Sequence, residues 1–118
     1  MKLAAELLTG LVALLHLYFL VLEMFLWDKP YGRRVFHLTP QFAAESRVLA
    51  ANQGLYNGFL AAGLIWSLLM GDVGRPVQVF FLGCVVVAGV FGGFTVGRKA
   101  FQFQAIPGLA ALVLALFS

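Results

Sequence analysis

The chain has 118 residues, of which 62% are hydrophobic and only 11% are charged, and its mean hydropathy is +0.95. Soluble globular domains are roughly half apolar and about a quarter charged, so this composition excludes a water-soluble fold of this size. The net charge of +3 comes from Lys and Arg residues scattered between apolar runs. That pattern is typical of a membrane topology signal, and it excludes a nucleic-acid-binding patch.

Four apolar runs predict an all-α fold, an integral membrane bundle of four spanning helices. The runs cover about residues 3–27, 48–70, 77–96 and 100–117. A spanning helix needs about 20 mostly apolar residues. The length therefore leaves no room for a separate soluble domain, and we expect residues 1–118 to form a single domain within the lipid bilayer.

The first run carries two ionisable residues on one helical face. His16 and Glu23 are seven residues apart, which is two helical turns, and Thr9 lies a further seven residues back. An ionisable side chain inside a span costs about 2.5–3.5 kcal/mol on insertion scales, so it indicates a functional site by default. The run is too long for a typical signal-peptide core and contains Glu23, so we expect it to be an uncleaved span.

The first loop, at residues 28–47, mixes basic and apolar residues and predicts an amphipathic segment at the headgroup surface. Within it, Thr39 followed by Pro40 predicts the start of a helix, with Thr39 as its N-cap. This loop contains four Lys or Arg residues and the third loop contains two, against two on the opposite side. The positive-inside rule therefore places both loops in the cytoplasm and both termini outside.

The second run carries a broad polar face, formed by Asn52, Gln53, Tyr56 and Asn57. Because this helix returns from the cytoplasm, we expect Asn52 and Gln53 near the level of Glu23. In the fourth run, Gln102, Gln104 and Pro107 predict a kinked or partly broken helix near the same membrane surface. Polar groups should thus converge in the cytoplasmic half, while the outer half is almost purely apolar.

Small residues at four-residue spacing predict close packing of helix backbones, which is how membrane helices associate. The second run contains Gly54, Gly58 and Ala62, and the third contains Gly89 and Gly93, with Gly97 directly after its last residue. Such seams can lie within one chain or between chains. We expect the glycines of the third run to hold a homo-oligomer.

Three functions remain open for the polar residues. The leading one is binding or transport of a small molecule or ion from the cytoplasmic side. The runner-up is an intramembrane enzyme with Glu23 and His16 as acid and base on a lipophilic substrate. The third is a structural accessory subunit, in which the amides only hold partner helices. The candidate ligand-binding residues are His16, Glu23, Asn52, Gln53, Tyr56, Asn57, Gln102 and Gln104.

We predict no metal site and no cofactor. His16 and Glu23 are two turns apart, Cys84 lies on another span, and His37 lies in the first loop, so no set of metal ligands is brought together. The single cysteine also excludes an internal disulfide, and Cys84 is interpreted as a small core residue.

Residues 14–16, 23–27 and 49–61 carry a resemblance to a known family. Its most specific part is the segment Asn-Gln-Gly-Leu-Tyr-Asn-Gly-Phe at residues 52–59. The chain resembles, over essentially its whole length, the bacterial domain-of-unknown-function family 1304. The resemblance implies a four-span protein of the bacterial inner membrane, and it implies no activity.

Overall fold

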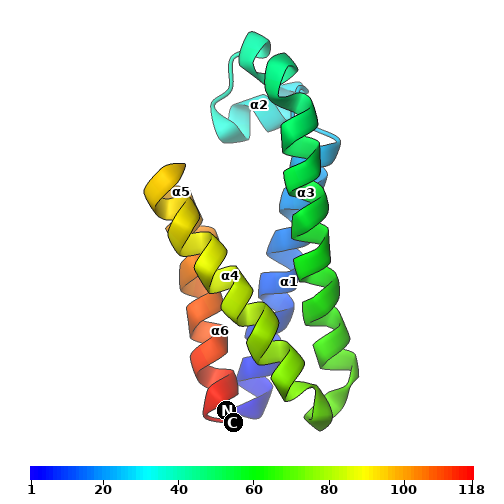
Figure 1. Cartoon of the computed structure of the whole chain (residues 1–118), viewed down its shortest axis with the longest axis vertical. Helices are drawn as coiled ribbons and strands as arrows, with labels where there is room; N and C mark the ends of the chain where they lie inside the picture. Colours follow the sequence, from blue (N-terminus) through cyan, green and yellow to red (C-terminus); the bar gives the residue numbers. More distant parts are fainter. The chain divides into compact units, whose positions relative to one another are not determined.

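The computed structural model describes residues 1–118 and is built of helices, without a strand (Figure 1). The all-α class predicted from the sequence is therefore confirmed. In chain order the elements are α1 (Lys2–Met24), α2 (Pro30–Phe36), α3 (Pro40–Leu69), the 3₁₀ turn η1 (Gly71–Gly74), α4 (Arg75–Thr95), α5 (Arg98–Ala100), the π-helical turn η2 (Phe101–Ala105) and α6 (Ile106–Leu116).

Three helical segments are long and apolar enough to cross a membrane, namely Lys2–Met24, Gly71–Thr95 and Arg98–Leu116. They correspond to the first, third and fourth apolar runs. Helix α3 has 30 residues, and a helix of that length extends about 45 Å, more than the hydrocarbon core of about 30 Å. Its amide side chains lower its hydropathy, so the crossing of the membrane by α3 stays a prediction.

The chain packs as two compact units. The first comprises Met1–Leu15 with Leu60–Ser118, and the second comprises His16–Phe59. Helices α1 and α3 contribute residues to both units. In the first unit α4 packs against α6 and η2. Its core contains small and branched apolar side chains, namely Ala5, Val12, Ala13, Leu64, Leu82, Val85, Ala111 and Ala115.

Two glycines of α4 form a packing seam inside the first unit. A Cβ atom on Gly89 would overlap the backbone of Ala105, and one on Gly93 would overlap the ring of Phe101. By contrast, a Cβ atom on Gly97 would meet open space. Gly89 and Gly93 therefore pack against residues of their own chain. A homo-oligomer through the glycines of this helix stays a prediction.

The last membrane helix is interrupted as the sequence predicts. The π-helical turn η2 comes directly before α6, and Pro107 lies in the first turn of α6. Proline has no N–H group, and its ring crowds the carbonyl four residues earlier. A π-turn at this place accommodates the altered hydrogen-bond pattern, so the partly broken helix is confirmed.

Helix α3 begins where the Thr39-Pro40 pair predicts. The backbone N–H of Phe42 donates a hydrogen bond to Thr39 Oγ1 at 3.1 Å, and Pro40 is the first helical residue. The hydroxyl satisfies one of the N–H groups that a helix start leaves without a partner. The predicted N-cap is therefore confirmed.

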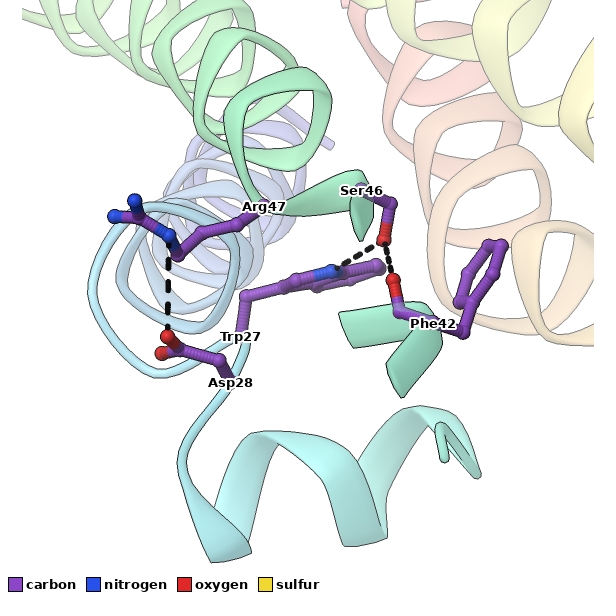
Figure 2. A network of polar contacts seen from close by, with 5 residues as sticks. All are labelled: Trp27, Asp28, Phe42, Ser46 and Arg47. Atoms are coloured by element: carbon purple, nitrogen blue, oxygen red, sulfur yellow. Dashed lines mark hydrogen bonds and ion pairs between the residues drawn. The ribbon is translucent and has the colours of Figure 1, made fainter. Parts of the chain in front are cut away.

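The segment between α1 and α3 is held against the first turns of α3 by polar contacts within the second unit (Figure 2). The Trp27 indole donates to Ser46 Oγ at 2.9 Å, and that hydroxyl donates to the Phe42 carbonyl at 2.7 Å. An ion pair joins Arg47 to Asp28 at 3.9 Å. The loop also contains the short helix α2, so it is an ordered segment rather than a linker.

Candidate functional site

The centre of the candidate site is a carboxyl group held by an amide. Asn57 of α3 donates a hydrogen bond from Nδ2 to Glu23 Oε1 of α1, and the two heavy atoms are 2.5 Å apart. Asn57 is only 5% exposed, and Glu23 is partly buried. Both residues belong to the second unit, which comprises His16–Phe59.

The glycines of α3 explain why these two side chains meet. A Cβ atom on Gly54 would lie 3.1 Å from the Cβ of Glu23 and 3.2 Å from the Leu20 carbonyl oxygen. A Cβ atom on Gly58 would lie 2.7 Å from a methyl group of Leu20. The missing side chains therefore let the backbones of α3 and α1 approach closely. The predicted seam on α3 positions the acid next to the amide.

Two further polar residues of α1, Thr9 and His16, lie on its buried face. Thr9 and His16 are fully buried, whereas Leu7 and Leu14, on the other side of the helix, are about two-thirds exposed, at 65% and 64%. The ring of His16 makes an edge contact with Phe19, with ring centroids 6.3 Å apart. The face predicted from the seven-residue spacing is thus the interior face of α1.

On α3, the structure brings Asn57 to Glu23 and leaves the other three predicted residues exposed. Asn52 donates its amide hydrogen to the Val48 carbonyl of its own helix at 2.9 Å. Gln53 and Tyr56 are both exposed, and the Tyr56 ring packs against Phe59. The polar face of α3 is therefore divided between a buried amide and an exposed surface.

Gln102 and Gln104 lie on η2 in the first unit. Gln102 is exposed and Gln104 is partly buried. Their contribution to a site with Glu23 stays a prediction.

The family model described as "Protein of unknown function (DUF1304)" matches residues 10–116. The chain belongs to this family. It is 28% identical over 119 residues to "Uncharacterized protein YpaA" of Lactococcus lactis subsp. lactis (strain IL1403). This match covers 99% of the chain and 100% of YpaA. No solved structure matches the chain.

A second relative is much longer than the chain. Over 86 residues the chain is 31% identical to "Macrolide export ATP-binding/permease protein MacB" of Wolinella succinogenes. The match covers 68% of the chain but only 13% of MacB. The similarity therefore concerns one segment of that protein.

This DUF1304 member has one buried amide, Gln78, that is not among the site residues predicted from the sequence. Gln78, in the first turns of α4, donates from Nε2 to Thr9 Oγ1 at 2.8 Å, and Thr9 Oγ1 donates to the Ala5 carbonyl at 2.7 Å. Together with the buried hydroxyl of Ser67, these groups show that the expectation of an almost purely apolar outer half is wrong. The sequence does carry a signal for this residue, because Gln78 is a polar residue at the second position of the third apolar run.

Gln78 also lines a small cavity in the first unit. Its volume is about 30 Å³, and its other lining groups include the charged residues Lys2, Glu6, Asp72 and Arg75. Lys2 and Asp72 form an exposed ion pair there. A cavity of this size with polar walls holds a water molecule rather than an organic ligand.

Proposed function

We propose that this protein binds a small monovalent cation at Glu23 and Asn57 and carries it across the membrane. The observation that carries the proposal is the Glu23–Asn57 contact, in which a buried amide of α3 holds a carboxyl group of α1, a helix long and apolar enough to cross a membrane. A carboxyl group at such a place is costly, and its ordinary uses are ion pathways and proton relays.

The charge of the site favours a monovalent cation. Asn57 is neutral, so Glu23 supplies a single negative charge when it is ionised. The structure has no group of three or more His, Cys, Asp or Glu side chains that could hold a metal ion. One carboxylate neutralises the single charge of a proton, Na⁺ or K⁺, whereas a divalent ion would leave a net positive charge at a site inside the membrane.

The position of the site supports movement across the membrane. Glu23 lies near the end of α1 that leads into the basic first loop. We place this loop on the cytoplasmic side of a bacterial inner membrane and both termini on the outer side. Along the buried face of α1, His16 and Thr9 repeat the polar position at seven-residue intervals. MacB, of which the match covers 13%, is named as a macrolide export ATP-binding/permease protein, and that name is why we favour transport over the enzyme and accessory functions.

Flux measurements in proteoliposomes test this proposal. Purified wild-type protein should dissipate an imposed gradient of H⁺, Na⁺ or K⁺ faster than protein-free vesicles do. Glu23→Gln removes the charge but keeps an oxygen that can accept from Asn57, so it should fold and lower the flux to the protein-free level. Glu45→Gln is the matched control, because Glu45 is exposed at the start of α3 and accepts a hydrogen bond from Gln41, one turn earlier on the same helix.

Two results would overturn the proposal. One is a wild-type protein that dissipates none of the three gradients, as an enzyme or an accessory subunit would behave. The other is a Glu23→Gln variant that retains the flux of Glu45→Gln.

A further inference from the structure

The short helix α2 is folded back against the end of α1. The Tyr18 hydroxyl of α1 and the Tyr31 hydroxyl of α2 form a hydrogen bond, with their oxygens 2.6 Å apart. A Cβ atom on Gly32 would overlap the backbone carbonyl of Leu26, so the missing side chain lets α2 lie against the chain that leaves α1. Because α1 ends at Met24, Tyr18 and its partner Tyr31 lie about 9 Å back along α1 from its end.

These contacts place α2 at a membrane surface. Helix α1 is long and apolar enough to cross the membrane, and its 23 residues extend about 35 Å, against a hydrocarbon core of about 30 Å. The end of α1 therefore lies at the boundary between hydrocarbon and headgroups, and α2 lies beside it. Trp and Tyr side chains are enriched at that boundary. Besides the two tyrosines, this end of α1 carries Trp27, whose ring packs on Phe36 with the centroids 5.0 Å apart.

Two adjacent arginines of α2 have no acidic partner in the second unit. Arg33 and Arg34 take part in neither ion pair of the structure, and Arg34 is exposed. The acidic side chains of this unit are held by other residues, in the contacts Asp28–Arg47, Glu23–Asn57 and Glu45–Gln41. The positive charge of α2 is therefore not neutralised within its own unit.

The rest of the chain cannot supply the missing negative charge at this membrane surface. Its two acidic side chains, Glu6 and Asp72, line the small cavity beside Lys2, at the opposite end of α1. The sequence after Asp72 contains no acidic residue, and its loop at residues 97–99 adds two basic ones. The excess of positive charge at this surface therefore does not depend on how the two units pack.

We propose that Arg33, Arg34 and the Tyr18–Tyr31 pair bind the phosphate of an anionic lipid headgroup. A guanidinium group presents a planar fork of N–H donors that matches two phosphate oxygens. The Arg34 guanidinium lies over the Tyr31 ring, 6.0 Å from its centroid, which brings its charge beside the tyrosine pair. In that pair one hydroxyl donates to the other, so the second hydroxyl keeps an O–H that can donate to phosphate.

The position of these groups selects a lipid headgroup over a soluble anion. Basic residues next to a spanning helix attract the anionic headgroups of the bilayer. Tyr18, Val21 and Phe25 lie on one side of α1, at three- and four-residue spacing, and all three are exposed. The acyl chains of a bound lipid can pack on this apolar stripe, whereas a free phosphate ion gains nothing from it. This lipid site is independent of the cation site at Glu23.

Quenching of tryptophan fluorescence by brominated lipids tests the site. In a Trp66→Phe background, Trp27 is the remaining tryptophan of the chain. The protein is reconstituted into vesicles of phosphatidylcholine and phosphatidylglycerol, with the acyl chains of one or the other lipid brominated. We expect phosphatidylglycerol to be enriched at Trp27. Arg33→Gln and Arg34→Gln should each lower that preference by about fivefold, the contribution of one basic residue near an anionic surface.

Arg47→Gln is the matched control, because it removes the same charge from the same segment, but Arg47 is already paired with Asp28 at 3.9 Å (Figure 2). It should retain the preference for phosphatidylglycerol. Tyr31→Phe keeps the ring and every charge, so it should lower the preference only if the hydroxyl binds the headgroup. No preference in the parent protein, an equal loss in Arg47→Gln, or an unchanged preference in Tyr31→Phe would each overturn the proposal.

Inorganic phosphate separates a lipid headgroup from a free anion. Added to the same vesicles, it should weaken the preference for phosphatidylglycerol no more than sodium chloride does at the same ionic strength, because both salts screen charge equally. A stronger effect of inorganic phosphate would assign the site to a soluble anion and would overturn the lipid assignment.

Discussion

Replacing Gly89 with leucine is expected to destabilise the packing of α4 on η2 and α6 strongly. A Cβ atom at this position overlaps the backbone nitrogen and Cα of Ala105, and the remaining leucine atoms add to the overlap. Overpacking usually costs about 1–3 kcal/mol even where flexible side chains can move aside. Here backbone atoms are in the way, so we expect the loss at or above the upper end of that range.

The thermal unfolding midpoint of the purified protein in detergent measures this effect. Gly83→Leu provides the control on the same helix, because a Cβ atom on Gly83 meets nothing within 4 Å. It should unfold at nearly the wild-type temperature. If Gly89→Leu matched Gly83→Leu in midpoint and in yield, the close packing of α4 on η2 would be wrong.

Replacing Asn57 with leucine is expected to have the second largest effect. The change removes the side chain that donates to Glu23 and leaves a partly buried carboxyl group without that bond. Loss of one partner of a buried polar group costs about 1–3 kcal/mol, whereas replacing both partners with apolar groups can be nearly neutral. Asn57→Leu should therefore lower the unfolding midpoint, and Asn57→Leu combined with Glu23→Leu should recover much of it.

A double-mutant cycle on these two positions separates a direct contact from independent effects. The two single variants and the double variant are compared by thermal unfolding under the same conditions. Flux should be lost in every variant that lacks Glu23, whatever its stability. Additive changes in the unfolding midpoint would contradict a direct interaction between Glu23 and Asn57.

Several features could be predicted from the sequence because they depend on neighbouring residues along the chain. The seven-residue spacing of Thr9, His16 and Glu23 defines one face of a helix whatever surrounds it. The Thr39-Pro40 pair defines a helix start through local hydrogen bonding. Pro107 interrupts its own helix for the same local reason.

Other features depend on which side of a helix a neighbour covers. Asn52, Gln53, Tyr56 and Asn57 lie within about 140° of a helix circumference, so they cannot all face α1. The glycines at positions 54 and 58 carry the missing signal, because they mark the side on which α1 approaches. Asn57 is the polar residue nearest to that side, and it is the one that reaches Glu23.

The partners of Gly89 and Gln78 could not be deduced from spacing. A small-residue stripe has the same sequence pattern whether it packs against its own chain or against another copy. Ala105 comes from a π-helical turn, whose extra residue shifts the register of every later contact on that helix. Likewise Gln78 meets Thr9 only because α1 and α4 are neighbours in the first unit.

Thermal unfolding of the purified protein at increasing concentrations of H⁺, Na⁺ and K⁺ tests the Glu23 cation site most directly. A ligand that binds only the folded state stabilises it by about 2.7 kcal/mol at a hundred times its dissociation constant. We predict that one of these cations raises the unfolding midpoint of the wild type and of Glu45→Gln in a saturable manner, and does not raise that of Glu23→Gln. An equal rise in Glu23→Gln, or no rise with any of the three cations, would contradict cation binding at Glu23.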